Sequence, residues 1–182
     1  MITTTRLGDL STKRRIVSLV LLVLLVLNMS LIFYFSAEGF DDTVNRSEQL
    51  AGTVVDIVDR YQQNQNQNKP MTEDQKEVAV EKMQFPVRKL AHFSEFMSLG
   101  GLACCLLLTL GLRPVWFASV AAGAFGLLYA VSDEVHQLFV DRRDGSFRDV
   151  MVDFAGVVCG VLAVVAIWAL IRYAKRRRRY AV

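Results

Sequence analysis

The chain has 182 residues, of which 53% are hydrophobic, and a net charge of +3, a composition too apolar for a soluble domain of this size. Its cysteines, Cys104, Cys105 and Cys159, all lie in apolar segments, which argues against a disulfide framework. A nucleic-acid partner is not expected either. The string Asp133-Glu134-Val135-His136 resembles a helicase box, but no phosphate-binding glycine loop accompanies it.

Four apolar segments are long enough to cross a bilayer, and they cover residues 16–35, 88–112, 114–138 and 150–172. About 20 residues span a hydrocarbon core of about 30 Å at about 1.5 Å per residue. Basic residues at 13–15 precede the first segment, as in a signal peptide. Its apolar run is long and no cleavage site follows, which favours a retained anchor. The sequence therefore predicts an all-α polytopic membrane protein with four transmembrane helices.

Charge predicts the orientation, because loops rich in Lys and Arg stay in the cytoplasm. Both ends of the chain are basic, whereas residues 36–84 carry ten Asp and Glu against five Lys and Arg. We expect a multi-pass protein of the cell membrane with both termini cytoplasmic. The predicted parts are a basic N-terminus (1–15), transmembrane helix 1 (16–35), an extracytoplasmic segment (36–84), a core of transmembrane helices 2–4 (85–172) and a basic tail (173–182).

The extracytoplasmic segment contains two helical patterns. Apolar residues at three- and four-residue spacing predict an amphipathic helix over about 41–61, and the Gln/Asn tract 62–68 predicts a loop. Thr72 and Gln75 have capping-box spacing and predict a second short helix over about 73–83. These helices either lie on the membrane and cover the bundle, or form a lid over an outward site.

Local signals place the ends of the later spans. Pro86 and Pro114 are each expected at the first helical position of a span, where proline is tolerated. A turn composition before Phe147 predicts that the fourth span begins there. Within that span, Gly156 and Gly160 have GxxxG spacing, which favours close helix packing inside the monomer over dimerisation. The oligomeric state stays open.

Ionisable residues border the predicted spans. A charged side chain costs about 2.5–3.5 kcal/mol at the middle of a membrane, so it seldom occurs in a span without a charged partner or a function. Helical spacing puts them on one face of each span, and the predicted topology puts the three faces at one level, near the outer leaflet. The residues on these faces are Arg88, His92 and Glu95, then Asp133 and His136, then Asp149 and Asp153. Glu134 points about 100° away from its neighbours' face and is not expected at the centre.

Several interpretations of these residues stay open. They form a site for an anionic lipid headgroup or phosphate, with arginines as the clamp and histidine as acid or base. They bind a divalent metal through His92, Glu95, Asp133 and His136, although the spacing matches no strong motif. They bind a ligand without chemistry, or they form an ion-pair network that only holds the helices together. A transporter is a weaker alternative, because no span is broken.

The chain resembles the VanZ-like family of small integral membrane proteins. The resemblance covers about residues 28–165 and is carried by three blocks: 87–96 (VRKLAHFSEF), 132–140 (SDEVHQLFV) and 143–150 (RDGSFRDV), followed by Asp153 and Gly156. Tyr34-Phe35-Ser36 and Ser47 also match, whereas Glu38 stands near a position where the family usually has Gln. The resemblance implies four helices and, for the namesake, lowered susceptibility to teicoplanin in Gram-positive bacteria.

These patterns lead to one functional hypothesis. The protein binds or modifies a lipid-linked cell-envelope component, with membrane lipids as partners and a lipoglycopeptide as a further candidate. We place His92, Glu95, Asp133 and His136 at the centre as candidate catalytic groups. The substrate-binding candidates are Arg88, Arg142, Arg143, Asp149 and Asp153. No cofactor is expected, and the rival hypothesis is a non-catalytic membrane scaffold.

Overall fold

The computed structural model describes residues 4–66, 70–140 and 145–180, which form helices and no strand. The helices are α1 (Thr4–Ser36), α2 (Phe40–Asn66), α3 (Glu73–Leu110), α4 (Val115–Gln137) and α5 (Phe147–Tyr180). Four of them contain stretches long and apolar enough to cross a membrane: Ser11–Ser36, Glu73–Leu110, Val115–Gln137 and Phe147–Arg178. The prediction of an all-α protein with four membrane-length helices is confirmed.

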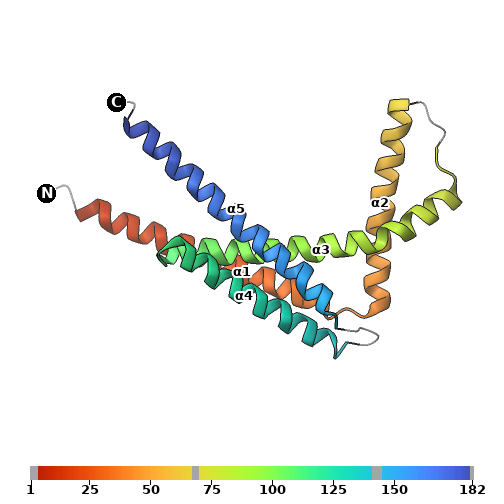
Figure 1. Ribbon diagram of the computed structural model, residues 1–182, viewed down its shortest axis with the longest axis horizontal. Coiled ribbons are helices and arrows are strands. Elements are labelled where there is room, and N and C mark those ends of the chain that lie inside the picture. Colours follow the sequence, from red (N-terminus) through yellow and green to blue (C-terminus); the bar gives the residue numbers. More distant parts are fainter. Residues whose placement is uncertain (1–3, 67–69, 141–144, 181–182) are drawn as a thin grey trace.

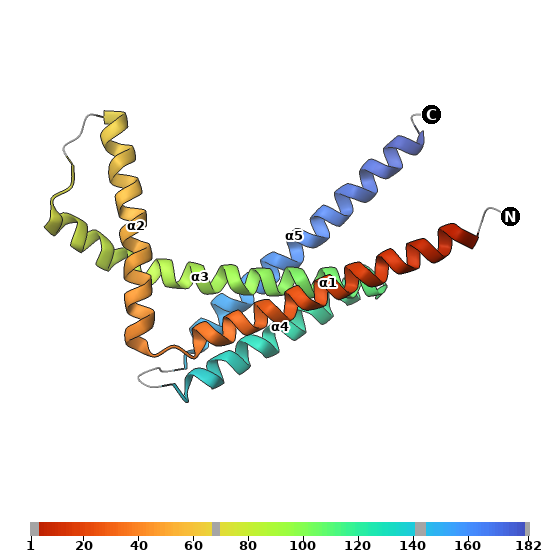
Figure 2. The same ribbon diagram turned by 180° about the vertical axis from the view of Figure 1, so that it is seen from behind.

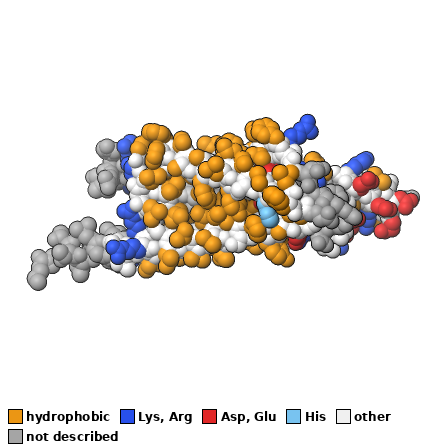
Figure 3. Space-filling model, turned by 90° about the horizontal axis from the view of Figure 1, so that it is seen from below, with side chains coloured by type: hydrophobic (Ala, Val, Ile, Leu, Met, Phe, Trp, Pro, Cys, Tyr) orange, Lys and Arg blue, Asp and Glu red, His pale blue; other side chains and the backbone are white. Residues whose placement is uncertain are grey.

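The four membrane-length helices, α1, α3, α4 and α5, form a bundle, and α2 lies across one of its ends (Figures 1 and 2). Helix α3 is the centre of the bundle, because it packs against each of the other four helices. Both chain termini lie at the end opposite α2 (Figure 1). We call that end the basic end, and it includes Arg14, Arg113 and Arg172. We call the opposite end, formed by the last turn of α4 and the first turns of α5, the acidic end. Figure 3 shows Lys and Arg side chains at both ends, and the visible Asp and Glu side chains toward the end opposite the termini.

Helix α3 corrects one prediction. The sequence predicted a short helix over about 73–83 and a separate span with Pro86 at its first position, but one helix runs from Glu73 to Leu110 with Pro86 inside it. An internal proline costs about 3 kcal/mol, because it removes one hydrogen bond and clashes with the preceding turn. Packing against α2 offsets this cost, and the Lys76 Nζ lies 3.2 Å from Asp56 Oδ1 of that helix. Figure 1 shows that α3 bends where it passes α2.

The ends of α3 follow the expected local rules. The predicted capping box is present: the backbone N–H of Gln75 donates to Thr72 Oγ1 at 3.3 Å, and the backbone N–H of Thr72 donates to Gln75 Oε1 at 3.0 Å. At the other end, Gly111 adopts a φ of 94°, a conformation that favours glycine, and its N–H donates to the carbonyls of the last turn. Pro114 is the N-cap of α4 rather than its first helical residue.

Helix α2 is longer than predicted. It continues through the Gln/Asn tract to Asn66, so the loop expected from 62 is wrong for 62–66, and 67–69 lie outside the described residues. Glutamine has a good helix propensity, and low complexity alone does not end a helix. One face of α2 is buried against α3, at Ser47, Ala51, Val55 and Asp59. A neighbouring apolar stripe is exposed, at Leu50, Val54, Ile57, Val58 and Tyr61.

Helices α3 and α5 approach each other through glycine. A Cβ on Gly156 would clash with the carbonyl of Phe93, and one on Gly160 would clash with the carbonyl of Met97. The predicted close packing within the monomer is therefore present. Larger core side chains fill the space on either side of this contact, and Phe96, Leu99 and Val157 are fully buried.

This contact gives a first testable result. We expect Gly160→Ala to lower the free energy of unfolding by about 1–3 kcal/mol, because overpacking forces the two backbones apart. Gly123→Ala on α4 is the matched control, since nothing lies within 4 Å of a Cβ there. SDS titration of the purified protein measures both. Equal stabilities of the two variants would contradict the close approach.

Candidate functional site

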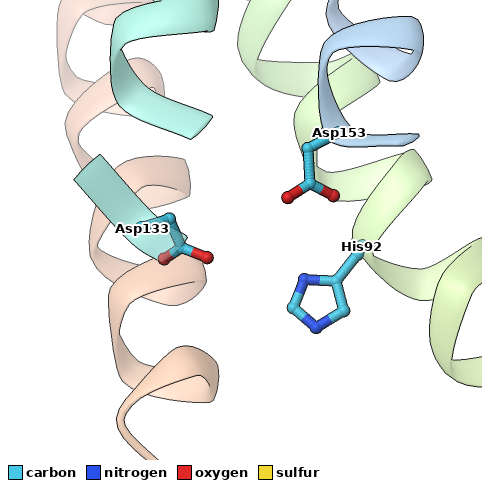
Figure 4. A group of neighbouring side chains, drawn as sticks. All are labelled: His92, Asp133 and Asp153. Carbon is cyan, nitrogen blue, oxygen red and sulfur yellow. The ribbon is translucent and has the colours of Figure 1, made fainter. Parts of the chain in front are cut away.

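Three side chains from three helices meet at the acidic end. His92 of α3, Asp133 of α4 and Asp153 of α5 each offer an atom that lies within 4.8 Å of the other two. Both carboxylates are buried, with Asp133 4% exposed and Asp153 2% exposed. The three side chains point toward a common centre in Figure 4. We call these residues the polar cluster.

The Asp133 carboxylate is held from two sides. The Ser36 hydroxyl at the end of α1 donates to Oδ2 at 2.7 Å, and the Gln137 amide nitrogen donates to the same oxygen at 3.0 Å. Gln137 also donates to Ser36 Oγ at 3.3 Å, so the three polar groups close a small network. Asp133 and Gln137 are four residues apart on α4, which places their side chains one turn apart on one face. This network fixes the direction of the carboxylate.

The two aspartates of α5 have different surroundings. Asp149, in the first turn, forms an ion pair with Lys89 of α3. Asp153, one turn later, points into the polar cluster, and no hydrogen bond or ion pair reaches its carboxylate from the part of the chain that the structure describes. Both residues are substrate-binding candidates from the sequence, whereas the structure puts Asp153 in the polar cluster and Asp149 beside Lys89.

The other two candidate catalytic residues lie beside the polar cluster. Glu95 is partly buried, and its Oε2 lies 4.0 Å from His92 Nδ1. The ring of His136 stacks on Phe33 of α1, with ring centroids 4.4 Å apart. Its Nε2 is buried and has no hydrogen-bond partner among the described residues. Glu95 and His136, which one interpretation of the sequence counts as metal ligands, are not in the group that His92 and Asp133 form with Asp153 among the described residues.

A pocket opens beside the polar cluster, between α2, α3 and the end of α1. It has a volume of about 190 Å³, and we call it the α2–α3 pocket. His92 and Glu95 line it together with the cations Arg46 and Arg88, and its apolar wall includes Phe35 and Leu50. His92 belongs to both the pocket and the polar cluster, so a molecule in the pocket would lie next to the buried carboxylates.

The two arginines of this pocket also contact other side chains. Arg46 forms an ion pair with Glu38, and its guanidinium lies 4.6 Å from the centroid of the Phe35 ring. The guanidinium of Arg88 lies 5.7 Å from the Phe85 centroid. These aromatic contacts orient the cations along the pocket wall. Arg142 and Arg143, the remaining substrate-binding candidates, lie outside the described residues.

Two further residues near the site have structural contacts. Glu134 is 6% exposed, and its Oε2 accepts from the Ser146 amide at 2.8 Å, which joins the end of α4 to the start of α5. It lies outside the polar cluster, as helical phase predicted. Tyr129, one turn before Asp133, donates to the Met29 carbonyl of α1 at 2.7 Å.

Sequence reasoning missed several residues that shape the site. Gln137 stands four residues after Asp133, and this spacing was a usable signal. Ser36 matches the family pattern, but nothing in its spacing relates it to Asp133. Lys89 stands between Arg88 and His92 but on another side of the helix, and its spacing does not point to Asp149. Arg46 lies on α2 and Glu38 on the linker before it. No local sequence pattern predicts where these segments lie relative to α3.

Comparison with known protein families matches residues 21–171 of this chain to the VanZ/LLP1 family. The matched range includes the site residues described above, all of α2, α3 and α4, and parts of α1 and α5. Curated proteins and solved structures give no match. The match covers most of the chain and agrees with the resemblance drawn from its sequence blocks, so the protein belongs to the VanZ/LLP1 family.

Proposed function

We propose that this membrane protein binds or modifies a lipid-linked cell-envelope component, or an amphiphilic glycopeptide of the teicoplanin type, in the α2–α3 pocket. The observation that carries the proposal is the lining of this pocket. It combines two arginines with apolar side chains and the two partly buried groups His92 and Glu95. Arginine recognises phosphate and carboxylate groups by paired hydrogen bonds, and an apolar wall accepts an alkyl chain.

The proposal places the acidic end outside the cytoplasm of a Gram-positive cell. The distribution of charge supports this orientation, because the Asp and Glu side chains visible in Figure 3 lie away from the end with both termini, where Lys and Arg side chains are seen without them. In that orientation, α2 lies at the outer surface of the membrane. Envelope precursors and glycopeptides are both present on that side.

The residues of the site receive distinct roles in the proposal. Arg88 contacts an anionic group of the ligand. Arg142 and Arg143 add positive charge, a role assigned from the sequence alone. His92 and Glu95 line the pocket, so any proton transfer to a ligand there falls to them. Asp133 and Asp153 lie behind His92 and set the charge around its ring. His136 and Asp149 support the neighbouring helices.

A scaffold role is the second candidate, and the hydrogen bonds of Asp133 favour it. Ser36 and Gln137 both donate to this carboxylate, and Lys89 neutralises Asp149, so part of the polar surface is already satisfied within the protein. A network of this kind holds α1, α3, α4 and α5 together without chemistry. The scaffold role requires no ligand in the pocket.

A susceptibility assay tests the proposal. The wild type, Arg88→Gln and Glu95→Gln are produced in a teicoplanin-sensitive Gram-positive host. We expect the wild type to raise the inhibitory concentration at least fourfold, and both variants to lose most of that protection, because they remove pocket groups. Glu77→Gln is the matched control, as Glu77 is an exposed glutamate of the same helix.

Membrane abundance of each variant is measured by immunoblot in the same cells. Variants that are abundant and protect like the wild type would contradict a role for the pocket. Lack of protection by the wild type would remove the glycopeptide from the proposal. Photo-crosslinking from the pocket to a polyprenyl-phosphate-linked precursor in nanodiscs then tests the other ligand class. If the precursor is not crosslinked either, the scaffold role is the candidate that remains.

A further inference from the structure

We propose that His92, Asp133 and Asp153 bind one divalent transition-metal ion. The three ligands are an imidazole nitrogen and two carboxylate oxygens, a set that suits Zn²⁺ or Mn²⁺. Each ligand comes from a different helix, so the ion would join α3, α4 and α5 at the acidic end. The proposal goes beyond the proposed function, because the site requires no ligand in the α2–α3 pocket.

The charges of the site are the first argument. Two buried carboxylates face each other in the polar cluster, and such a pair is strongly destabilising unless a cation or a proton compensates it. Two of the cations nearby have other partners: Lys89 pairs with Asp149, and Arg46 pairs with Glu38. A divalent cation between Asp133 and Asp153 would neutralise both carboxylates at once.

The environment of Asp153 is the second argument. Its side chain is 2% exposed and points into the polar cluster (Figure 4), yet it receives no hydrogen bond or ion pair from the residues described. Buried carboxylates are normally paired, hydrogen-bonded or bound to metal. Asp133 is oriented by Ser36 and Gln137, which is the kind of outer support that metal-binding carboxylates commonly have.

The geometry is the third argument. Ligand atoms around a shared ion, at about 2.1 Å from it, lie roughly 3.0–3.5 Å from one another. The three atoms already lie within 4.8 Å of each other, so small side-chain rotations close the site. Three protein ligands leave at least one position for water or another molecule. His92 lines the α2–α3 pocket, so that position would face the pocket.

Calorimetry on the full-length protein in nanodiscs tests the site. After removal of metal with EDTA, Zn²⁺, Mn²⁺, Mg²⁺ and Ca²⁺ are titrated in separate experiments. We expect one ion per chain for Zn²⁺ or Mn²⁺, and much weaker binding of Mg²⁺ and Ca²⁺, which avoid imidazole. Asp153→Asn and His92→Gln should each weaken binding at least tenfold. Failure of the wild type to bind Zn²⁺ or Mn²⁺ overturns the proposal.

Matched controls separate the site from its surroundings. His136→Gln changes the other histidine, and the double variant Lys89→Met with Asp149→Asn changes the other aspartate of α5 without leaving an unpaired lysine. Both should bind metal like the wild type. Equal loss in these controls and in Asp153→Asn overturns the assignment of ligands.

A spectroscopic measurement covers the case in which the site variants fail to fold. Co²⁺ bound to the wild type should show ligand-field bands typical of nitrogen and oxygen ligands, without a thiolate charge-transfer band. A thiolate band would assign the metal to cysteine and overturn the proposal. The alternative is a proton shared by the two carboxylates instead of a metal ion. It would appear as the infrared C=O stretch of a protonated carboxyl in the metal-free wild type. Persistence of this band after Zn²⁺ or Mn²⁺ is added would also overturn the proposal.

Discussion

Lys89→Met is expected to lower the free energy of unfolding by about 2–4 kcal/mol. The substitution leaves Asp149 charged and without its partner, at side-chain exposures of 22% for Lys89 and 29% for Asp149. Removing one member of a fully buried ion pair costs about 3–5 kcal/mol, and the partial exposure of this pair reduces the loss. SDS titration of the purified protein measures the change.

A double-mutant cycle shows whether the loss comes from the unpaired charge. Lys89→Met combined with Asp149→Asn should recover more than half of the lost stability, because no charge is then left alone. Lys82→Met, at an exposed lysine of the same helix, is the control and should change stability by less than about 0.5 kcal/mol. A double variant that is no more stable than Lys89→Met alone would show that the two residues are not coupled.

Phe96→Ala is expected to have the largest effect on stability, a loss of about 3–5 kcal/mol. Phe96 is fully buried in the core, and its ring lies 6.1 Å from that of Tyr129, centroid to centroid. Removing the ring leaves a cavity between α3 and α4, one turn from His92. The unfolding transition in SDS and the rate of limited proteolysis both report the loss.

The control for this variant is Phe125→Ala on α4. The Phe125 side chain is 37% exposed and faces outward from the bundle, so its removal should cost less than about 1 kcal/mol. A Phe96→Ala protein as stable as this control would mean that the α3–α4 interface is not packed as described.

Much of the fold could be predicted from the sequence because its signals are local. The four apolar segments, the capping box at Thr72 and the glycine spacing of α5 all depend on neighbouring residues. The continuity of α3 through Pro86 was missed, because it depends on tertiary packing against α2, which overrides the local preference of proline.

The candidate site shows where local reasoning ends. Helical phase gives the residues that share a face, and the predicted topology puts His92, Asp133 and Asp153 at one level of the bundle. It does not give the rotation of one helix against another, which decides that Asp153 points into the polar cluster while His136 stacks on Phe33. Ser36 could not be connected with Asp133, because the hydrogen bond joins residues 97 positions apart.

The exposed stripe of α2 has a consequence for how a ligand would be measured. Leu50 belongs both to this stripe and to the wall of the α2–α3 pocket, so the pocket opens beside an apolar surface suited to the lipid interface. An amphiphile would then arrive by lateral diffusion within the leaflet. Its apparent dissociation constant in bulk units would rise with the lipid concentration of the sample, because the bilayer is the solvent from which it binds. Affinities determined at different lipid loadings become comparable only when they are expressed as mole fractions in the membrane.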